Sequence, residues 1–192
     1  VGTMGVQMLR HIGADPVIAT AGSGKSAAYL RGELGVRPEN ILRYGGLSVG
    51  ELADRAVEMN GGRLFRATFD FVGKDMKKLC ARVVDYWGHI VSCAPEPGAP
   101  IPDFFSSSEG PLFTKSASFH SVFLRSPVRG GGRPYWGTYR EALGVIRDWV
   151  EAGHIRPLAV ENLGPMSAAN IAEAHRRLEE GHTQGKLVLS VG

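Results

Sequence analysis

Val1-Gly2-Thr3-Met4-Gly5 begins the sequence, and the residues after it, Val6 to Ile12, are those of a short helix. Gly2 and Gly5 keep the spacing of the last two glycines in the motif G-x-G-x-x-G. In that motif the glycines allow a close approach of the backbone to a pyrophosphate, which the free N–H groups of the following helix bind. Two glycines at this spacing are common at helix starts, so the stretch alone is a weak signal. We expect its pyrophosphate contacts at Gly2, Thr3 and Met4.

A second glycine turn, Ala21-Gly22-Ser23-Gly24-Lys25, follows the predicted strand Pro16 to Thr20. The second strand of a Rossmann fold ends near the adenine ribose, where an Asp or Glu would bind the 2′-hydroxyl. This turn has no carboxylate and offers a hydroxyl, a cation and open backbone amides instead, which suit a 2′-phosphate. The two turns together therefore predict an NADPH site, to which this turn contributes Gly22, Ser23 and Lys25.

The same residues allow a second interpretation. Ala19 to Ser26 has the spacing of a Walker A motif with Ala in place of its first glycine, and it lies between an apolar strand and a predicted helix. A P-loop ATPase or kinase is therefore an alternative. Two features count against it: a complete glycine-turn element precedes the stretch, and the best Walker B candidate, Leu64 to Asp70, has Arg66 in its middle.

Composition and charge narrow the function classes. With 192 residues, of which 43% are hydrophobic and 21% charged, the chain is typical of a soluble globular protein with one good core. Its net charge of +3 is spread along the sequence, so we expect no nucleic-acid surface. No apolar run approaches the roughly 18 residues of a membrane span, so we expect no membrane partner.

Cys80 and Cys93 stand alone without C-x-x-C, which predicts neither a zinc site nor a disulfide framework. Two isolated cysteines favour the cytoplasm, with mitochondria as the alternative location.

Predicted strands and helices alternate along the chain with short turns between them. Helices are predicted at 26–34, 49–59, 75–87, 139–152 and 168–180, and strands at 41–44, 64–72, 89–94, 116–124 and 186–191. Ser48 and Glu51 have capping-box spacing at the start of the second of these helices. The alternation predicts an α/β fold with a parallel, doubly wound sheet. Pro95 to Pro111 is expected to be a loop, and the glycine-rich connection Ser126 to Gly137 is the best domain boundary.

Several loose motifs follow one another over the whole length of the chain. They are Val1–Gln7, Val17–Ser23, Ile41–Tyr44, Phe69–Gly73, Val122–Leu124, and Glu173–Gly181 with Gly185–Leu189. In this order and spacing they resemble the medium-chain dehydrogenase/reductase superfamily, most closely its zinc-independent quinone oxidoreductase (zeta-crystallin-like) branch. In the same order, these motifs correspond to features of that branch. They are its glycine turn with a Val-Gln helix start, its second strand and phosphate turn, its sequence motifs "VINY" and "FDSVG", its sixth strand and its usual C-terminal segment.

This resemblance implies hydride transfer from NADPH to a quinone, an enone or enoyl compound, or an aldehyde. It places Tyr44 at the adenine or the 2′-phosphate. It also implies that strand ends line the pyrophosphate and nicotinamide, largely through backbone groups, at Val72, Ser92, Cys93, Ala94, Val122 and Phe123. The sequence identifies no catalytic residue and no metal ligand. A homodimer formed through the sixth strand is expected, while a zinc alcohol dehydrogenase with its ligands upstream and a dinucleotide sensor without turnover remain alternatives.

Members of this superfamily carry an upstream domain, a partly open β-barrel, and a first Rossmann strand just before the glycine turn. Neither is in this sequence. We therefore expect residues 1–125 to form the NADP-binding domain and residues 126–192 to form the segment that returns to the barrel-like catalytic domain. The missing strand would be central in the order 3-2-1-4-5-6, which predicts a gap between the strands Pro16–Thr20 and Leu64–Val72.

Overall fold

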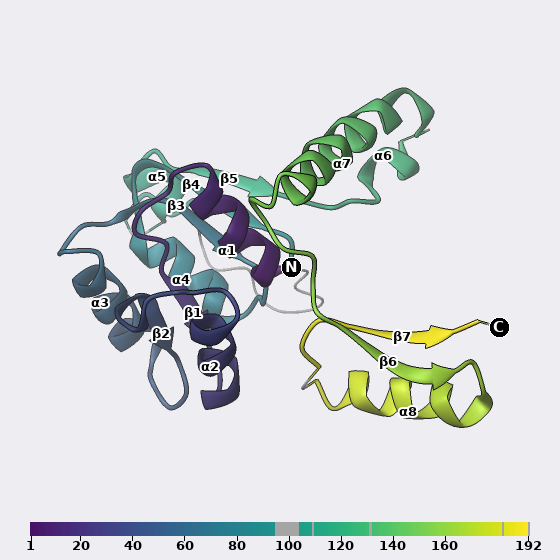
Figure 1. Ribbon diagram of the computed structural model, residues 1–192. Helices are drawn as coiled ribbons and strands as arrows, with labels where there is room; N and C mark the ends of the chain where they lie inside the picture. Colours follow the sequence, from purple (N-terminus) through teal and green to yellow (C-terminus); the bar gives the residue numbers. More distant parts are fainter. Residues whose placement is uncertain (95–103, 109, 131, 182, 192) are drawn as a thin grey trace. The chain divides into compact units, whose positions relative to one another are not determined.

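The computed structural model describes residues 1–94, 104–108, 110–130, 132–181 and 183–191 (Figure 1). The chain divides into two compact units, residues 1–144 and residues 145–192, and each is described by itself. These units are defined by contacts within the chain. The predicted boundary at residues 125 and 126 concerns domains of a longer protein and stays a prediction. Most of the predicted loop 95–111 lies outside the described residues.

The first unit alternates helices with parallel strands. Its elements are α1 (Gly2–His11), β1 (Ala19–Ala21), α2 (Gly24–Gly32), η1 (Pro38–Asn40), β2 (Ile41–Arg43), α3 (Val49–Met59), β3 (Phe65–Asp70), α4 (Asp75–Val83), β4 (Val84–Ser92), α5 (Pro111–Thr114), β5 (Ser118–Ser121), α6 (Ser126–Arg129), η2 (Arg133–Tyr135) and α7 (Trp136–Glu151), the last of which extends into the second unit. β1 pairs with β2, β3 with β4, and β4 with β5, and every pairing is parallel. This confirms the predicted Rossmann-type α/β fold with parallel strands.

β1 and β3 belong to different sheets. Among the described residues, one sheet has the order β1-β2 and the other the order β3-β4-β5. These are the strands on either side of the predicted gap, so the separation agrees with that prediction.

Two apolar clusters hold the first unit together. The first lies between α3, α4 and β2, and its buried members are Leu42, Leu52, Ala53, Ala56, Met76, Leu79 and Val83. The second lies at β4, and its members are Cys80, Ala81, Val84, Ile90, Phe104 and Ala117. Val84 and Ile90 are 0% exposed. Each fully buried aliphatic side chain of this size contributes about 1.5–3 kcal/mol relative to an exposed one.

The capping box at the start of α3 is confirmed. The Ser48 hydroxyl accepts a hydrogen bond from the Glu51 backbone N–H at 3.3 Å, and the Glu51 carboxylate accepts one from the Ser48 N–H at 2.8 Å. The bond from the Ser48 N–H to the carboxylate is the main cause that lowers the pKa of Glu51, and the Ser48 hydroxyl, which donates to the same carboxylate at 2.7 Å, lowers it further. At the other end Asn60 closes the helix, and its amide group donates to the Arg63 and Leu64 carbonyls.

The helix predicted over 75–87 is wrong in its last turn. α4 ends at Val83, and β4 begins at Val84. The β3–β4 register shifts here, because residues 85–88 are inserted between the pairs Phe65–Val84 and Ala67–His89. Lys115 stabilises the change: its ammonium group donates to the Val84 carbonyl at 2.7 Å, and its own carbonyl accepts from the Trp87 N–H at 2.8 Å. These contacts come from a distant part of the chain, so local helical spacing could not predict them.

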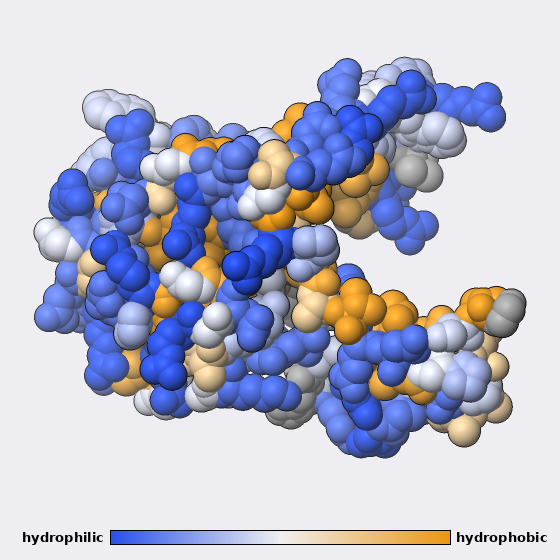
Figure 2. All heavy atoms as spheres, in the orientation of Figure 1, coloured by the Kyte–Doolittle hydropathy of each residue, from blue (hydrophilic) through white to orange (hydrophobic). Residues whose placement is uncertain are grey.

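The second unit is a strand–helix–strand motif. β6 (Val160–Pro165) and β7 (Lys186–Ser190) pair in parallel, and α8 (Ala168–Glu179) connects them. Arg177 joins α8 to β6 through Glu161 at 2.7 Å and also bonds Glu173 at 2.7 Å. Hydrogen bonds from Arg176 and Arg177 lower the pKa of Glu173 to about 2. Figure 2 shows apolar side chains at the surface of the two strands, and Val160 is 62% exposed.

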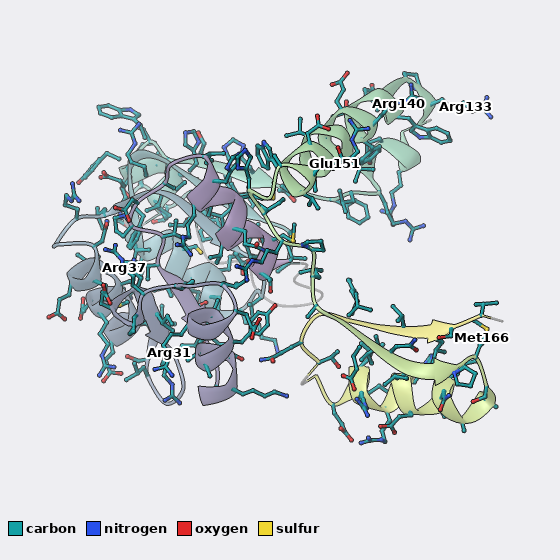
Figure 3. All side chains as sticks on the ribbon, viewed as in Figure 1. Arg31, Arg37, Arg133, Arg140, Glu151 and Met166 are labelled. Atoms are coloured by element: carbon teal, nitrogen blue, oxygen red, sulfur yellow. The ribbon has the colours of Figure 1, made fainter. Side chains whose placement is uncertain are left out.

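Polar contacts also join loops of the first unit. Arg37, labelled in Figure 3, bonds Asp15 at 3.3 Å and lies 3.6 Å from Glu39. The bond to Asp15 ties the loop after α1 to the start of η1. All three side chains are largely exposed, so the ion pairs add little to stability.

Candidate functional site

The carboxyl ends of β3, β4 and β5 form one continuous edge. The Cys93 N–H donates to the Asp70 carbonyl at 3.1 Å, and the Val122 N–H donates to the Ser92 carbonyl at 2.8 Å. Parallel pairing places all three strand ends on the same side of the sheet. The structure therefore brings together five of the predicted site residues, Val72, Ser92, Cys93, Ala94 and Val122.

Asp70 organises this edge, although Asp70 is not among the binding residues predicted from the sequence. Its side chain is buried, and its Oδ1 accepts hydrogen bonds from the Val72 N–H at 3.0 Å and the Gly73 N–H at 2.7 Å. Oδ2 accepts a bond from the Ser92 hydroxyl at 2.8 Å. One carboxylate thus fixes the turn after β3 and the end of β4.

Lys77 completes the same network from α4. Its ammonium group lies 3.7 Å from Asp70 Oδ2 and donates to the Ala94 carbonyl at 3.0 Å. The Lys77 side chain is 7% exposed and that of Asp70 is 0% exposed. Helical spacing could have placed Lys77 on the inner face of α4, but its partners depend on how β3 and β4 pair.

The first glycines lie in a helix, so the predicted turn at Val1 to Gly5 is wrong. α1 begins at Gly2, and the glycines serve its packing. A Cβ on Gly5 would lie 3.1 Å from the ring of Phe71, and a Cβ on Gly2 would lie 3.7 Å from it. Small residues therefore let the start of α1 approach the residue that follows β3.

The predicted pyrophosphate residues all lie in this first helical turn, at Gly2, Thr3 and Met4. The first N–H groups of any helix have no acceptor within the helix. In α1 the Val1 carbonyl accepts from Met4 and Gly5, so Gly2 and Thr3 are the donors at the open end. Such donors, together with the helix dipole, suit an anion.

The second predicted turn is compact and brings Gly22 and Tyr44 together. A Cβ on Gly22 would lie 2.6 Å from the Tyr44 hydroxyl oxygen, so the phenol ring rests directly on this backbone. The Tyr44 N–H donates to the Ala21 carbonyl at 3.2 Å. Ser23 caps α2, and its hydroxyl accepts from the Ser26 N–H at 3.1 Å. Lys25 is exposed in the first turn of α2.

The P-loop interpretation does not fit this geometry. A Walker A loop uses its backbone N–H groups to surround phosphates, and it needs the residues before the lysine to form a loop. Here Ala19 to Ala21 pair with β2 as a strand, and α2 begins at Gly24. Only Gly22 and Ser23 remain between the two elements, which is too short to surround a phosphate.

The remaining predicted residue, Phe123, follows β5 and is 49% exposed. The Arg129 guanidinium lies 5.3 Å from the centre of its ring. Phe123 directly follows Val122 in the sequence, but its ring lies against Arg129 of α6. Of the two thiols, Cys80 is buried, and burial raises its pKa to about 12, so it is protonated at neutral pH.

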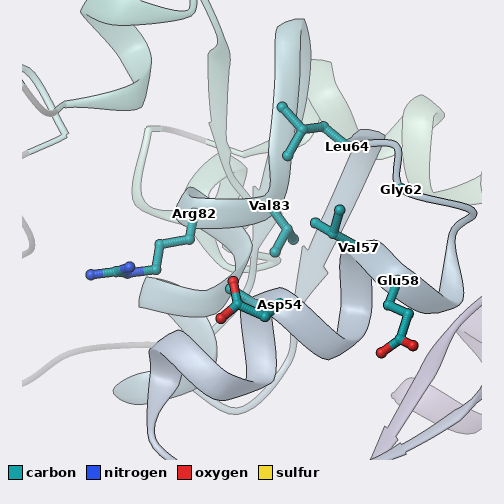
Figure 4. A pocket seen from close by; sticks show the side chains of 8 residues that line it. Asp54, Val57, Glu58, Gly62, Leu64, Arg82 and Val83 are labelled. Atoms are coloured by element: carbon teal, nitrogen blue, oxygen red, sulfur yellow. The ribbon is translucent and has the colours of Figure 1, made fainter.

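A hollow of about 610 Å³ lies elsewhere in the first unit, between α3 and the end of α4 (Figure 4). Its lining includes Asp54, Glu58, Leu64 and Arg82. Leu64 precedes β3, so the hollow is at the amino end of that strand, opposite the edge built around Asp70. None of the predicted site residues lines it.

Two absences hold for the residues that the structure describes. Within them, no group of three or more His, Cys, Asp or Glu side chains is arranged to hold a metal ion. Every helix in the described part of the chain falls short of the length and apolar character that a membrane span requires.

Comparisons with known proteins identify relatives. Residues 49–189 match the model of the zinc-binding dehydrogenase family. No curated protein matches the chain. A provisionally assigned alcohol dehydrogenase from Sinorhizobium meliloti superposes with a TM-score of 0.73 and 22% identity, over 100% of this chain and 45% of the other. For a quinone oxidoreductase from Pseudomonas syringae the values are 0.70 and 20%, over 98% of this chain and 53% of the other.

A third solved structure is 2-octenoyl-CoA carboxylase reductase from a Streptomyces species. Its TM-score is 0.69 at 20% identity, over 97% of this chain and 37% of the other. The chain thus spans about half the length of these structures, or less. At such identities the likeness shows that the fold is shared.

Proposed function

The chain belongs to the zinc-binding dehydrogenase family, within the medium-chain dehydrogenase/reductase superfamily, and we propose that it provides the NADPH site of a reductase. One observation carries this proposal. Gly2 and Gly5 of α1 pack on Phe71, so the open amides of α1 and the ends of β3, β4 and β5 lie at the same edge. Ligands of open α/β sheets bind at this edge, with the pyrophosphate at a helix start.

The choice of NADPH over NADH rests on the turn after β1. Residues 19–26 contain no carboxylate that could bind a ribose 2′-hydroxyl. Ser23, Lys25 and the Tyr44 hydroxyl are gathered around Gly22 and α2. A cation and hydroxyl groups favour a phosphate at this position.

The proposed reaction is hydride transfer to a quinone, an enone or enoyl compound, or an aldehyde. NADPH supplies the hydride when it is bound. The chain's own part would be to bind and orient it: α1 would hold the pyrophosphate, and the backbone at Cys93, Ala94 and Val122 would line the nicotinamide. The substrate gains the hydride at an electron-poor carbon and a proton at its oxygen or adjacent carbon, and we assign no residue as the proton donor.

Two measurements on the full-length protein test this proposal. Fluorescence titration should show tighter binding of NADPH than of NADH, with no binding of ATP. NADPH oxidation should then depend on an added quinone, enone or aldehyde. Tight ATP binding in place of NADPH would refute the proposal, and NADPH binding with none of these substrates reduced would indicate a sensor without turnover.

A zinc alcohol dehydrogenase is the second candidate, because the matching family is named for zinc binding. Activity that disappears on dialysis against a chelator and returns with zinc would favour it.

We also propose a homodimer formed at β5, which lies at the edge of the order β3-β4-β5 and is followed by the exposed residues Val122 to Leu124. Sedimentation as a monomer at micromolar concentration would contradict the dimer. The cytoplasm is the proposed location, with mitochondria as the alternative, and no nucleic acid or membrane is proposed as a partner.

A further inference from the structure

Lys77 is buried where a lysine is unusual. On the same helix, Lys78 is exposed and pairs with Asp75 at 2.9 Å, as lysines commonly do. The Lys77 side chain is only 7% exposed, and burial of an ammonium group is unfavourable unless it is paired and hydrogen-bonded. An apolar residue at this place in α4 would avoid that cost. The position of its partners suggests what the buried charge does.

Among the described residues, Lys77 has a polar partner at the end of β3 and another just after β4. Asp70 Oδ2 is 3.7 Å from the ammonium nitrogen, and the Ala94 carbonyl accepts its hydrogen bond at 3.0 Å. Asp70 is itself held by the Val72 and Gly73 amides and by the Ser92 hydroxyl. Asp70 therefore keeps three partners without Lys77. The Ala94 carbonyl, by contrast, depends on Lys77 for its contact with this network.

Ala94, which accepts the hydrogen bond from Lys77, is the residue that matters for the orientation of the nicotinamide. Cys93 and Ala94 follow β4 at the edge where the nicotinamide lies under the proposed function. The Cys93 N–H is fixed by the Asp70 carbonyl at 3.1 Å, one residue before the Lys77 contact. Lys77 thus fixes the carbonyl group of the next residue along this edge, Ala94.

We propose that Lys77 is a positioning residue that sets the orientation of the nicotinamide through the Ala94 carbonyl. This inference rests on the proposed NADPH-dependent reductase function. The pyrophosphate and 2′-phosphate sites, at α1 and at the turn after β1, provide most of the binding energy and are separate from Lys77. Loss of Lys77 therefore slows hydride transfer more than it weakens NADPH binding.

The test uses Lys77→Met in the full-length protein, with Lys78→Met as the matched control on the same helix. We expect Lys77→Met to keep its NADPH Kd within about threefold of the wild type, while kcat falls on the order of 10-fold to 100-fold, as misplacement of a reacting group does. The primary deuterium isotope effect with NADPH labelled at the transferred hydrogen should rise, because hydride transfer becomes rate-limiting. Lys78→Met should leave all three values unchanged.

A merely structural role gives a different result. A smaller fraction of active enzyme lowers kcat without changing the isotope effect, and that outcome would overturn the proposal, as would a kcat within twofold of the wild type. If Lys77→Met does not fold, Lys77→Gln replaces it, because its amide can still donate to the Ala94 carbonyl; it should show the same pattern with a smaller fall in kcat. A wild-type protein that neither binds nor oxidises NADPH would instead refute the proposed function itself.

Discussion

Replacement of Gly22 by alanine tests whether the turn after β1 and Tyr44 form one side of the adenosine site. The new Cβ would lie 2.6 Å from the Tyr44 hydroxyl oxygen and 2.8 Å from the adjacent ring carbon, so the ring must move. Gly22 has no positive φ, so the backbone itself accepts alanine. If Tyr44 stacks on the adenine, its displacement should cost about 0.5–1.5 kcal/mol of binding, the value of an aromatic pair. We expect the Kd of NADPH to rise by about 2-fold to 12-fold.

Isothermal titration with NADPH and NADH measures this effect. Gly24→Ala is the matched control, since a Cβ there meets no atom within 4 Å. A double-mutant cycle adds Tyr44→Ala, in which the Gly22→Ala substitution should have no further effect because the displaced ring is gone. Unchanged affinity in Gly22→Ala would refute the role of Tyr44, and so would a loss of affinity that persists in the Tyr44→Ala background.

Three shorter predictions concern the cofactor phosphate, a helix cap and a thiol. Lys25→Ala should reduce the preference for NADPH over NADH by about 1–3 kcal/mol in paired titrations, with Arg31→Ala on the same helix as the control. Ser48→Ala should lower the free energy of unfolding in urea by about 1 kcal/mol. Because the pKa of Glu51 is lowered on folding, the stability lost in Glu51→Gln should be evident at neutral pH and should shrink as the pH falls below the ordinary pKa of a glutamate and through that lowered pKa. Cys80, whose pKa is raised to about 12, should react with a thiol reagent only after unfolding, and its modification in the native protein would contradict the burial.

Local signals predicted much of this fold because their partners are close in sequence. The capping box needs only Ser48 and Glu51, three residues apart, and it set the start of α3 correctly. The patterns that predicted the alternating strands and helices likewise extend over a few residues. These features were sufficient to predict parallel strands, and the resemblance to the superfamily then implied the edge at which Ser92 and Val122 meet.

Predictions from local sequence patterns were wrong or incomplete where a residue distant in the sequence determines the structure. The last turn of the predicted helix 75–87 is replaced by a strand because Lys115, about thirty positions away, bonds the backbone at Val84 and Trp87. Lys77 was missed for a related reason. It reads as one of two adjacent surface lysines, and only the pairing of β3 with β4 brings Asp70 and Ala94 within its reach.

The structure separates the groups that shape the candidate site from those that would touch a ligand. Asp70 and Lys77 are buried and bond the backbone or each other, while the edge itself presents backbone groups at Cys93, Ala94 and Val122. A backbone surface does not depend on the side chains it carries, provided that the buried groups beneath it hold its shape. The fold is also shared with solved structures at 20–22% sequence identity. It also follows that substitutions at the exposed side chains of the edge should slow hydride transfer less than substitutions at the buried pair beneath it.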